Sequence, residues 1–313
     1  MTSGSKEPLA ALDTWITSVL GGRVGRVVAV TGGDIHRTHR IECADGRVAF
    51  VKWNERAQPG MFAAEARGLN WLRDARAIAV PRVLGWVEGL STSAGSRRRD
   101  AASVPPTDAG LSALLLEYVA PETPTVRHWE TLGRQLAALH TSGAEMFGAS
   151  HANFIGTLPQ DNTCEQSWAS FWIERRLEPQ FRRVVDTGKA PARWLARLPR
   201  LYERVRKLIV EPARPERIHG DLWSGNVIMS GAWGPVLVDP AAYGGHGEVD
   251  LAMMRLFGGF EPRVYAAYAE VRGHAPGAEE RLGLYQLYPL LVHANLFGGS
   301  YVGSVDALVS ALS

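Results

Sequence analysis

Cysteine is scarce in this chain of 313 residues, which contains only Cys43 and Cys164. The two lie far apart in the sequence and fit no metal-binding spacing, so neither a disulfide framework nor a thiolate zinc site is expected. We predict instead that both are small side chains of a buried core.

Long apolar runs are missing as well. No stretch reaches the roughly 18 apolar residues that cross a bilayer, and the first residues, MTSGSKEP, contain no apolar signal core.

An excess of one charge is also absent, because the chain has 34 basic and 32 acidic residues. A chain with so small a net charge is not expected to present a strongly basic surface to nucleic acid. We therefore expect a cytoplasmic globular protein without membrane or nucleic-acid partners, whose oligomeric state the sequence does not indicate.

The chain has ample apolar material, since 46% of its residues are hydrophobic, and its length exceeds what one compact core usually holds. Its first part predicts a helix over 7–21 and then an antiparallel meander of short β-branched runs at 24–30, 38–43 and 47–53. A second helix is expected over 61–76. Glu65 would lie on the apolar stripe of that helix, which faces the sheet.

Beyond residue 120 the pattern becomes helical, with apolar stripes over 126–140, 166–185, 192–210 and 281–297. We therefore predict an α+β protein of two lobes, 1–120 and 121–313. Residues 91–110, STSAGSRRRDAASVPPTDAG, are rich in Ser, Pro, Gly and Arg and lack periodicity. They predict a flexible insertion within the first lobe, with a solvated arginine run.

The segment RIHGDLWSGNVIM, residues 217–229, places Asp221 and Asn226 around a glycine turn just before a short apolar strand. The turn SGAWG and the strand PVLVD follow, so a hairpin should return Asp239 to the side of Asn226. A carboxylate and a carboxamide oxygen that converge suit Mg²⁺, which completes its shell with substrate phosphates. The segment therefore predicts a site for Mg²⁺ and a nucleotide.

The spacing of His219, Asp221 and Asn226 also matches the catalytic loop of kinases, where the Asp orients or deprotonates the attacking hydroxyl and the Asn holds a metal. Each of these residues alone also fits a plain structural role in a turn or at a strand end. Their order along the chain is harder to explain that way. A glycine turn, a strand lysine, a helix glutamate, this loop and a hairpin aspartate follow one another as in kinases, which favours phosphoryl transfer.

At these residues the chain resembles the fructosamine kinases, also called ketosamine-3-kinases. The resemblance is carried by HGDLWSGN, by DPAAYGGHGEVDLAMMRLFGGF at 239–260, by NFIGTLPQDN at 153–162 and by LYQLYPLLVHANLFGGSY at 284–301. It covers nearly the whole chain outside residues 91–110. It implies the aminoglycoside-phosphotransferase-like variant of the protein kinase fold.

The resemblance also implies roles for single residues. Asp221 would be the catalytic base, with Asn226 and Asp239 holding Mg²⁺. His219 would support the loop, and Asp250 would brace it, although Asp250 equally fits a helix N-cap. ATP would be bound by the glycine turn of Gly32 and Gly33. Lys52, paired with Glu65, would contact the ATP phosphates. The backbone of Glu117, Tyr118 and Val119 would meet the adenine.

For the acceptor, the resemblance implies the 3-hydroxyl of a ketosamine, the sugar adduct of an amine, and hence a deglycation repair enzyme. Which ketosamine is preferred, and whether the amine is a small molecule or part of a glycated protein, stay open. A pocket facing Asp221 and suited to a neutral polyhydroxy chain is expected from five side chains: Trp223, Tyr243, His293, Asn295 and Tyr301.

Other functions fit the sequence less well. A protein kinase would need a long activation segment, yet Asp239 and Glu248 are only nine positions apart and no APE follows. A kinase of an aminoglycoside or amino alcohol stays an alternative, although residues 281–313 contain one acid, Asp306, to meet several cationic groups. A nucleotide-binding pseudokinase should have lost the base or a metal ligand, and none is missing.

Overall fold

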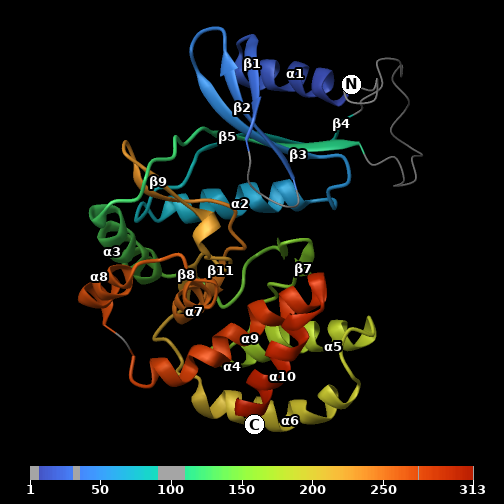
Figure 1. Ribbon diagram of the computed structural model, residues 1–313, viewed down its shortest axis with the longest axis vertical. Helices are drawn as coiled ribbons and strands as arrows, with labels where there is room; N and C mark the ends of the chain where they lie inside the picture. Colours follow the sequence, from blue (N-terminus) through green and yellow to red (C-terminus); the bar gives the residue numbers. More distant parts are fainter. Residues whose placement is uncertain (1–6, 31–35, 91–109, 274, 313) are drawn as a thin grey trace. The chain divides into compact units, whose positions relative to one another are not determined.

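The computed structural model describes residues 7–30, 36–90, 110–273 and 275–312 (Figure 1). The predicted glycine turn, Gly32 and Gly33, lies outside these ranges, as does the predicted insertion apart from its last residue. The chain divides into two compact units, and each is described by itself. The N-terminal unit contains residues up to 70 together with 81–120, and the C-terminal unit contains 71–80 together with 121–313.

The N-terminal unit is an antiparallel five-stranded sheet in the order β1-β2-β3-β5-β4, as its β-branched runs predict. Its elements are α1 (Glu7–Leu20), β1 (Val24–Ala29), β2 (Arg37–Cys43), β3 (Val48–Asn54), the first part of α2 (Met61–Asp74), β4 (Val83–Leu90) and β5 (Leu111–Glu117). The predicted helix over 61–76 is confirmed but ends two residues early, with Arg76 in the left-handed region at φ 53°.

Alternation along β3 gives its two faces different neighbours. Val51 and Trp53 point into an apolar core with Leu12 and Ile16 of α1. Lys52 therefore points to the opposite face of the sheet. It is almost fully buried there, and its cross-strand neighbours are Thr38 of β2 and Leu114 of β5.

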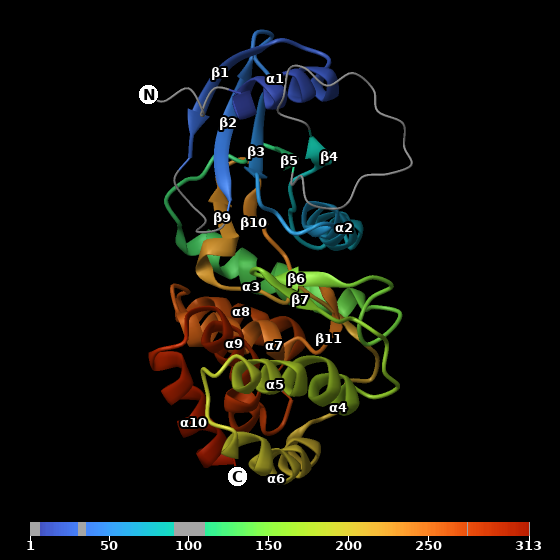
Figure 2. The ribbon, with the colours of Figure 1, turned by 90° about the vertical axis from the view of Figure 1, so that its right-hand side faces the viewer.

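The C-terminal unit is mostly helical, as predicted. Its elements in chain order are α3 (Val126–Ser142), β6 (Asn153–Ile155), β7 (Leu158–Gln160), α4 (Trp168–Phe171), the π-helix η2 (Trp172–Leu177), α5 (Glu178–Asp186), α6 (Arg193–Leu208), β8 (Glu216–Ile218), the 3₁₀ turn η3 (Ser224–Asn226), β9 (Val227–Ser230), β10 (Gly234–Leu237), β11 (Tyr243–Gly245), α7 (Glu248–Phe257), α8 (Pro262–Arg272), α9 (Ala278–Phe297) and α10 (Ser300–Leu312). Helix α9 packs against both α5 and α10 in this unit (Figure 2).

The core of this unit is rich in aromatic rings. Trp168, Phe171, Trp172 and Tyr285 are fully buried, and the Trp168 ring centroid lies within 6.5 Å of the other three. The predicted helix over 166–185 supplies most of them, but the structure divides it into α4, η2 and α5. An extra residue per turn in a π-helix rotates the apolar stripe, which periodicity alone does not reveal.

Two kinds of difference from the sequence predictions remain. Helices α8 and α10 were not predicted, because α8 buries only Val264, Ala267 and Tyr268 and α10 buries only Val305 and Val309. Cys43 is buried as predicted, but the prediction for Cys164 was wrong, since it is exposed. None of the described helices has the length and apolar character that a bilayer crossing requires.

Candidate active site

The loop after β8 carries the motif that the sequence singled out. Strand β8 pairs with β11, and the chain then turns at Gly220, whose φ is +80°. A Cβ on Gly220 would lie 2.4 Å from the carbonyl oxygen of Ala241, so only glycine allows the two segments to approach this closely. The neighbouring His219 is fully buried, and its Nε2 lies 2.9 Å from the Val238 carbonyl oxygen.

Asp250 holds this loop through its backbone. Its two carboxylate oxygens accept the N–H groups of His219 and Gly220, each at 2.8 Å, and the side chain is fully buried. The N-cap position of α7 belongs to Gly247, so Asp250 is not the cap of that helix. Charge-assisted bonds to backbone N–H groups are among the stronger hydrogen bonds in proteins, so this carboxylate fixes the backbone that leads to Asp221.

His140 at the end of α3 is a partner that the sequence analysis missed. Its Nε2 lies 3.1 Å from Oδ2 of Asp250, and its Nδ1 lies 2.9 Å from the Tyr268 hydroxyl. Burial lowers the pKa of His140, so the ring is neutral near pH 7. Burial alone would raise the pKa of Asp250, but the bonds from His140 and the His219 backbone hold it below its usual range. The carboxylate is therefore ionised and donates nothing to the loop.

Asp221, Asn226 and Asp239 are brought together in the C-terminal unit. The Asn226 amide donates to the Asp221 backbone oxygen at 2.8 Å, to Asp221 Oδ2 at 3.3 Å and to the Asp239 backbone oxygen at 3.4 Å. Strands β9 and β10 pair in register, and the Val238 N–H donates to the Asn226 carbonyl oxygen at 3.0 Å. The hairpin thus closes as its sequence predicts.

Two features set these carboxylates apart from ordinary turn residues. Asp239 has a φ of +54°, a conformation that non-glycine residues adopt rarely and that recurs at active sites. Burial raises the pKa of Asp221 to about 7, with a further rise from the charge of Asp239 and an opposing contribution from the Asn226 amide. A proton acceptor whose pKa lies near neutrality is well placed for general-base chemistry.

The donor set at this hairpin suits a divalent cation. Because the Asn226 side-chain nitrogen donates to Asp221 and to the Asp239 backbone oxygen, the side-chain oxygen of Asn226 remains an acceptor on the same hairpin as Asp239. Among the described residues no group of three His, Cys, Asp or Glu side chains could enclose a metal ion. Two protein oxygens with the rest of the shell supplied by phosphates and water is an arrangement that Mg²⁺ commonly adopts, so the residues fit this ion.

In the N-terminal unit, Lys52 and Glu65 form a buried ion pair. The Lys52 ammonium lies 2.6 Å from Glu65 Oε1, and the two side chains are 3% and 12% exposed. Burying two charges is costly unless they pair, so the lysine is held in one place at the sheet face. At the end of β5, the Glu117 N–H donates to the Arg82 carbonyl oxygen at 2.9 Å, and Val119 is buried. The nucleotide contacts assigned to Tyr118 and its neighbours stay predictions.

The five side chains predicted for the acceptor pocket have different surroundings. Trp223 is exposed, and its indole lies against Gly225. Tyr243 is fully buried, with the Arg176 guanidinium 3.9 Å from its ring centroid. Asn295 is buried and donates to the Gln180 side chain at 2.7 Å. Only His293 and Tyr301 are seen together, with ring centroids 4.9 Å apart.

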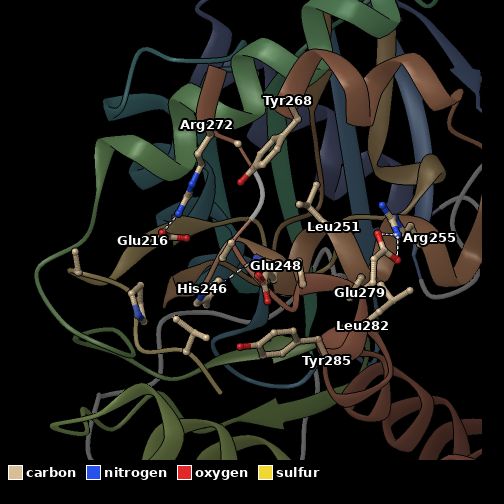
Figure 3. Close-up of a pocket in the computed structure, with 17 residues that line it drawn as sticks. Glu216, His246, Glu248, Leu251, Arg255, Tyr268, Arg272, Glu279, Leu282 and Tyr285 are labelled. Atoms are coloured by element: carbon tan, nitrogen blue, oxygen red, sulfur yellow. Dashed lines mark hydrogen bonds and ion pairs between the residues drawn. The ribbon is translucent and has the colours of Figure 1, made fainter. Parts of the chain in front are cut away.

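A cavity of about 330 Å³ lies elsewhere in the C-terminal unit, against α7, α8 and the start of α9 (Figure 3). None of the predicted site residues lines it. Its charged groups already pair with one another, as Glu216 with Arg272 and Arg255 with Glu279. This cavity is therefore not the site that the sequence indicates.

Comparison with known proteins gives one consistent result. The sequence pattern of the fructosamine kinase family matches residues 11–313. A probable ketoamine kinase of Enterococcus faecium is 37% identical over 287 residues, which cover 91% of this chain and 94% of that protein.

Solved structures give the same result. A candidate fructosamine-3-kinase of Thermobifida fusca is 37% identical with a TM-score of 0.82, over 96% of this chain and 98% of that one. Another, from Haemophilus somnus, is 25% identical with a TM-score of 0.81, over 97% of both chains. The predicted kinase-like α+β fold is confirmed by these matches.

Proposed function

The chain belongs to the fructosamine kinase family and carries out ATP-dependent phosphoryl transfer, and on that premise we propose that it phosphorylates the 3-hydroxyl group of ketosamines. The observation that carries the proposal is the cluster of Asp221, Asn226 and Asp239. The side-chain amide of Asn226 links the three residues, because it donates hydrogen bonds to both Asp221 and Asp239. A general base in the loop before the hairpin, beside two groups that can bind a cation, is what a phosphoryl-transfer site requires.

Asp221 is the residue that acts on the acceptor. Its carboxylate accepts the proton of the attacking hydroxyl while the hydroxyl oxygen forms a bond to the γ-phosphorus of ATP. The bond from that phosphorus to the bridging oxygen breaks, and ADP leaves with both bonding electrons. The Asn226 amide, which donates to Asp221 Oδ2, orients the carboxylate for this step.

Asn226 and Asp239 would hold Mg²⁺, which when bound neutralises charge on the transferred phosphoryl group. Lys52 would contact the phosphates of ATP, since its pair with Glu65 fixes a positive charge at the sheet face. The neighbourhood of Glu117, Tyr118 and Val119 would meet the adenine through backbone groups.

The acceptor is proposed to be a small-molecule ketosamine or the glycated amine of a protein. A phosphate at C3 is a good leaving group near the ketoamine carbonyl, so the product can break down and release the amine. The reaction would therefore repair amines that sugars have modified. Trp223, His293 and Tyr301 offer aromatic faces for the apolar side of such a sugar chain.

A coupled assay of ADP release across a panel of acceptors tests this proposal. We expect kcat/KM for a ribulosamine or fructosamine to exceed that for kanamycin by at least about two orders of magnitude. An aminoglycoside carries several ammonium groups and would find few carboxylates to offset their desolvation. Equal values for the two classes, or turnover of the antibiotic alone, would refute the ketosamine assignment and leave the kinase chemistry in place.

A further inference from the structure

Four aromatic rings meet at the surface of the C-terminal unit, and we propose that they bind the secondary ammonium group of the acceptor. This aromatic patch consists of Phe257, His293, Phe297 and Tyr301. The inference rests on the proposed function, because it names which part of a ketosamine the patch recognises.

The patch is assembled from three helices. The His293 ring centroid in α9 lies 4.8 Å from that of Phe257 at the end of α7 and 4.9 Å from that of Tyr301 at the start of α10. Phe297, one turn beyond His293, lies 5.6 Å from it and 6.2 Å from Tyr301. Distances of this order are those of rings in direct contact, so the four form one cluster.

The patch is open to solvent, unlike the aromatic core of the same unit. Phe297 is 65% exposed, and the other three rings are partly buried, so each keeps some surface in contact with solvent. A cluster of large apolar rings that stays in water usually marks a binding surface. Trp168 and Tyr285, by contrast, are fully buried, and the Trp168 Nε1–H donates to the Tyr285 hydroxyl at 3.0 Å.

His293 adds one hydrogen-bond acceptor to this surface. Its Nδ1 lies 2.8 Å from the Pro289 carbonyl oxygen, so Nδ1 carries the hydrogen. Burial lowers the pKa of His293, which keeps the ring neutral near pH 7. A neutral imidazole with a hydrogen on Nδ1 leaves Nε2 as an acceptor for an N–H group.

The chain segment that follows Phe257 packs on the catalytic loop. The chain after Phe257 passes through Gly259, where a Cβ would lie 2.6 Å from the Ser224 side chain. Ser224 follows Asp221 by three positions in the loop. The segment that positions Phe257 therefore packs directly on the loop that carries the proposed base.

The chemistry of the acceptor matches this arrangement. A ketosamine carries its nitrogen on C1 and the reacting hydroxyl on C3, so a hydroxyl at Asp221 leaves the nitrogen only a few bonds away. Aromatic faces attract a cation through their quadrupoles, and His293 can accept one of its N–H groups. None of the four side chains is a carboxylate, so the patch suits one ammonium group and not the several of an aminoglycoside.

The test compares two acceptors that differ at one atom, 1-deoxy-1-(methylamino)fructose and its ether analogue 1-O-methylfructose. We expect the wild-type enzyme to prefer the amine by at least about tenfold in kcat/KM. Phe297→Leu keeps an apolar side chain but removes the π face, and should lower this preference by about fivefold. The matched control is Trp233→Leu, which removes an exposed aromatic ring outside the patch and should leave the preference unchanged.

The possible outcomes separate the two proposals. If the wild-type enzyme phosphorylates ketosamines but uses the ether equally well, the patch does not read the ammonium group while the proposed function stands. The patch is likewise excluded as the ammonium site if Phe297→Leu, shown by circular dichroism to be folded, keeps the full preference. If the wild-type enzyme phosphorylates neither compound, the proposed function itself fails, and this inference with it.

Discussion

The Nε2 atom of His140 lies 3.1 Å from Oδ2 of Asp250, and neither side chain is exposed to solvent. The two residues are separated by 110 positions in the sequence. Asp250 in turn accepts the backbone N–H groups of His219 and Gly220 at 2.8 Å. Asp250 therefore fixes the backbone that leads to Asp221. Asp250 is itself held in place by His140 of α3, a helix distant from it in the sequence.

Replacing His140 by leucine should disturb both folding and turnover. The variant removes one donor from a buried carboxylate, and a buried charge that loses a partner costs about 3 kcal/mol. His140→Gln places an amide nitrogen near the position of Nε2 and should recover most of the loss. Urea unfolding and kcat at saturating substrate measure the two effects. If leucine and glutamine behave alike, the hydrogen bond to Asp250 has no special importance.

The Asp221→Asn variant should lose about 10² to 10⁴ in kcat, since a positioned base supplies that much to a proton transfer. ATP affinity should change little, because the base acts on the acceptor and contributes mainly in the transition state. Steady-state kinetics and nucleotide titration give the two values. A variant with wild-type kcat would remove Asp221 from its proposed role.

How far the sequence predicts the site depends on how local each contact is. Asn226 and Asp239 are joined by a short hairpin, and its alternation and turn residues are enough to place them together. The pairing of Lys52 with Glu65 follows from one strand face and one helix stripe. These relations use periods of two and 3.6 residues, which can be read directly along a sequence.

Contacts between distant helices could not be predicted in this way. The residue His140 ends an amphipathic stripe, and nothing in its own helix indicates Asp250 as its partner. Tyr243 illustrates the opposite difficulty, because an aromatic ring near a catalytic motif suits a pocket as well as a core. In the structure it is fully buried beneath Arg176, a placement that the packing of β11 and η2 decides.

The metal assignment predicts a change in cation dependence. Asn226→Ala and Asp239→Ala each remove one oxygen from the proposed Mg²⁺ site, so activity should require more Mg²⁺ or disappear. Titration of Mg²⁺ at fixed ATP measures the shift, and the matched control is Asp186→Ala, an exposed carboxylate of α5. If both site variants keep the wild-type Mg²⁺ curve, neither residue belongs to the metal site.

The buried histidine His246 predicts how stability responds to acid. Burial lowers its pKa from 6.5 to about 4, with a smaller lowering by Arg281 and an opposing effect of Glu248. The unfolded chain therefore takes up a proton on this ring below pH 6.5, while the folded chain does so only near pH 4. Stability from this group is complete above pH 6.5 and declines as the pH falls through that window.

Between pH 7 and pH 5 the decline amounts to about 2 kcal/mol for His246. His246→Asn keeps a side-chain acceptor for the Glu248 N–H, which His246 Nδ1 now bonds at 3.1 Å, but it cannot titrate. Asp221, whose pKa is raised to about 7, acts in the opposite sense in both proteins, so its contribution cancels in the comparison. Urea unfolding at the two pH values should show that the variant loses about 2 kcal/mol less than the wild-type protein. Equal losses would mean that His246 is protonated as readily in the folded chain as in the unfolded one.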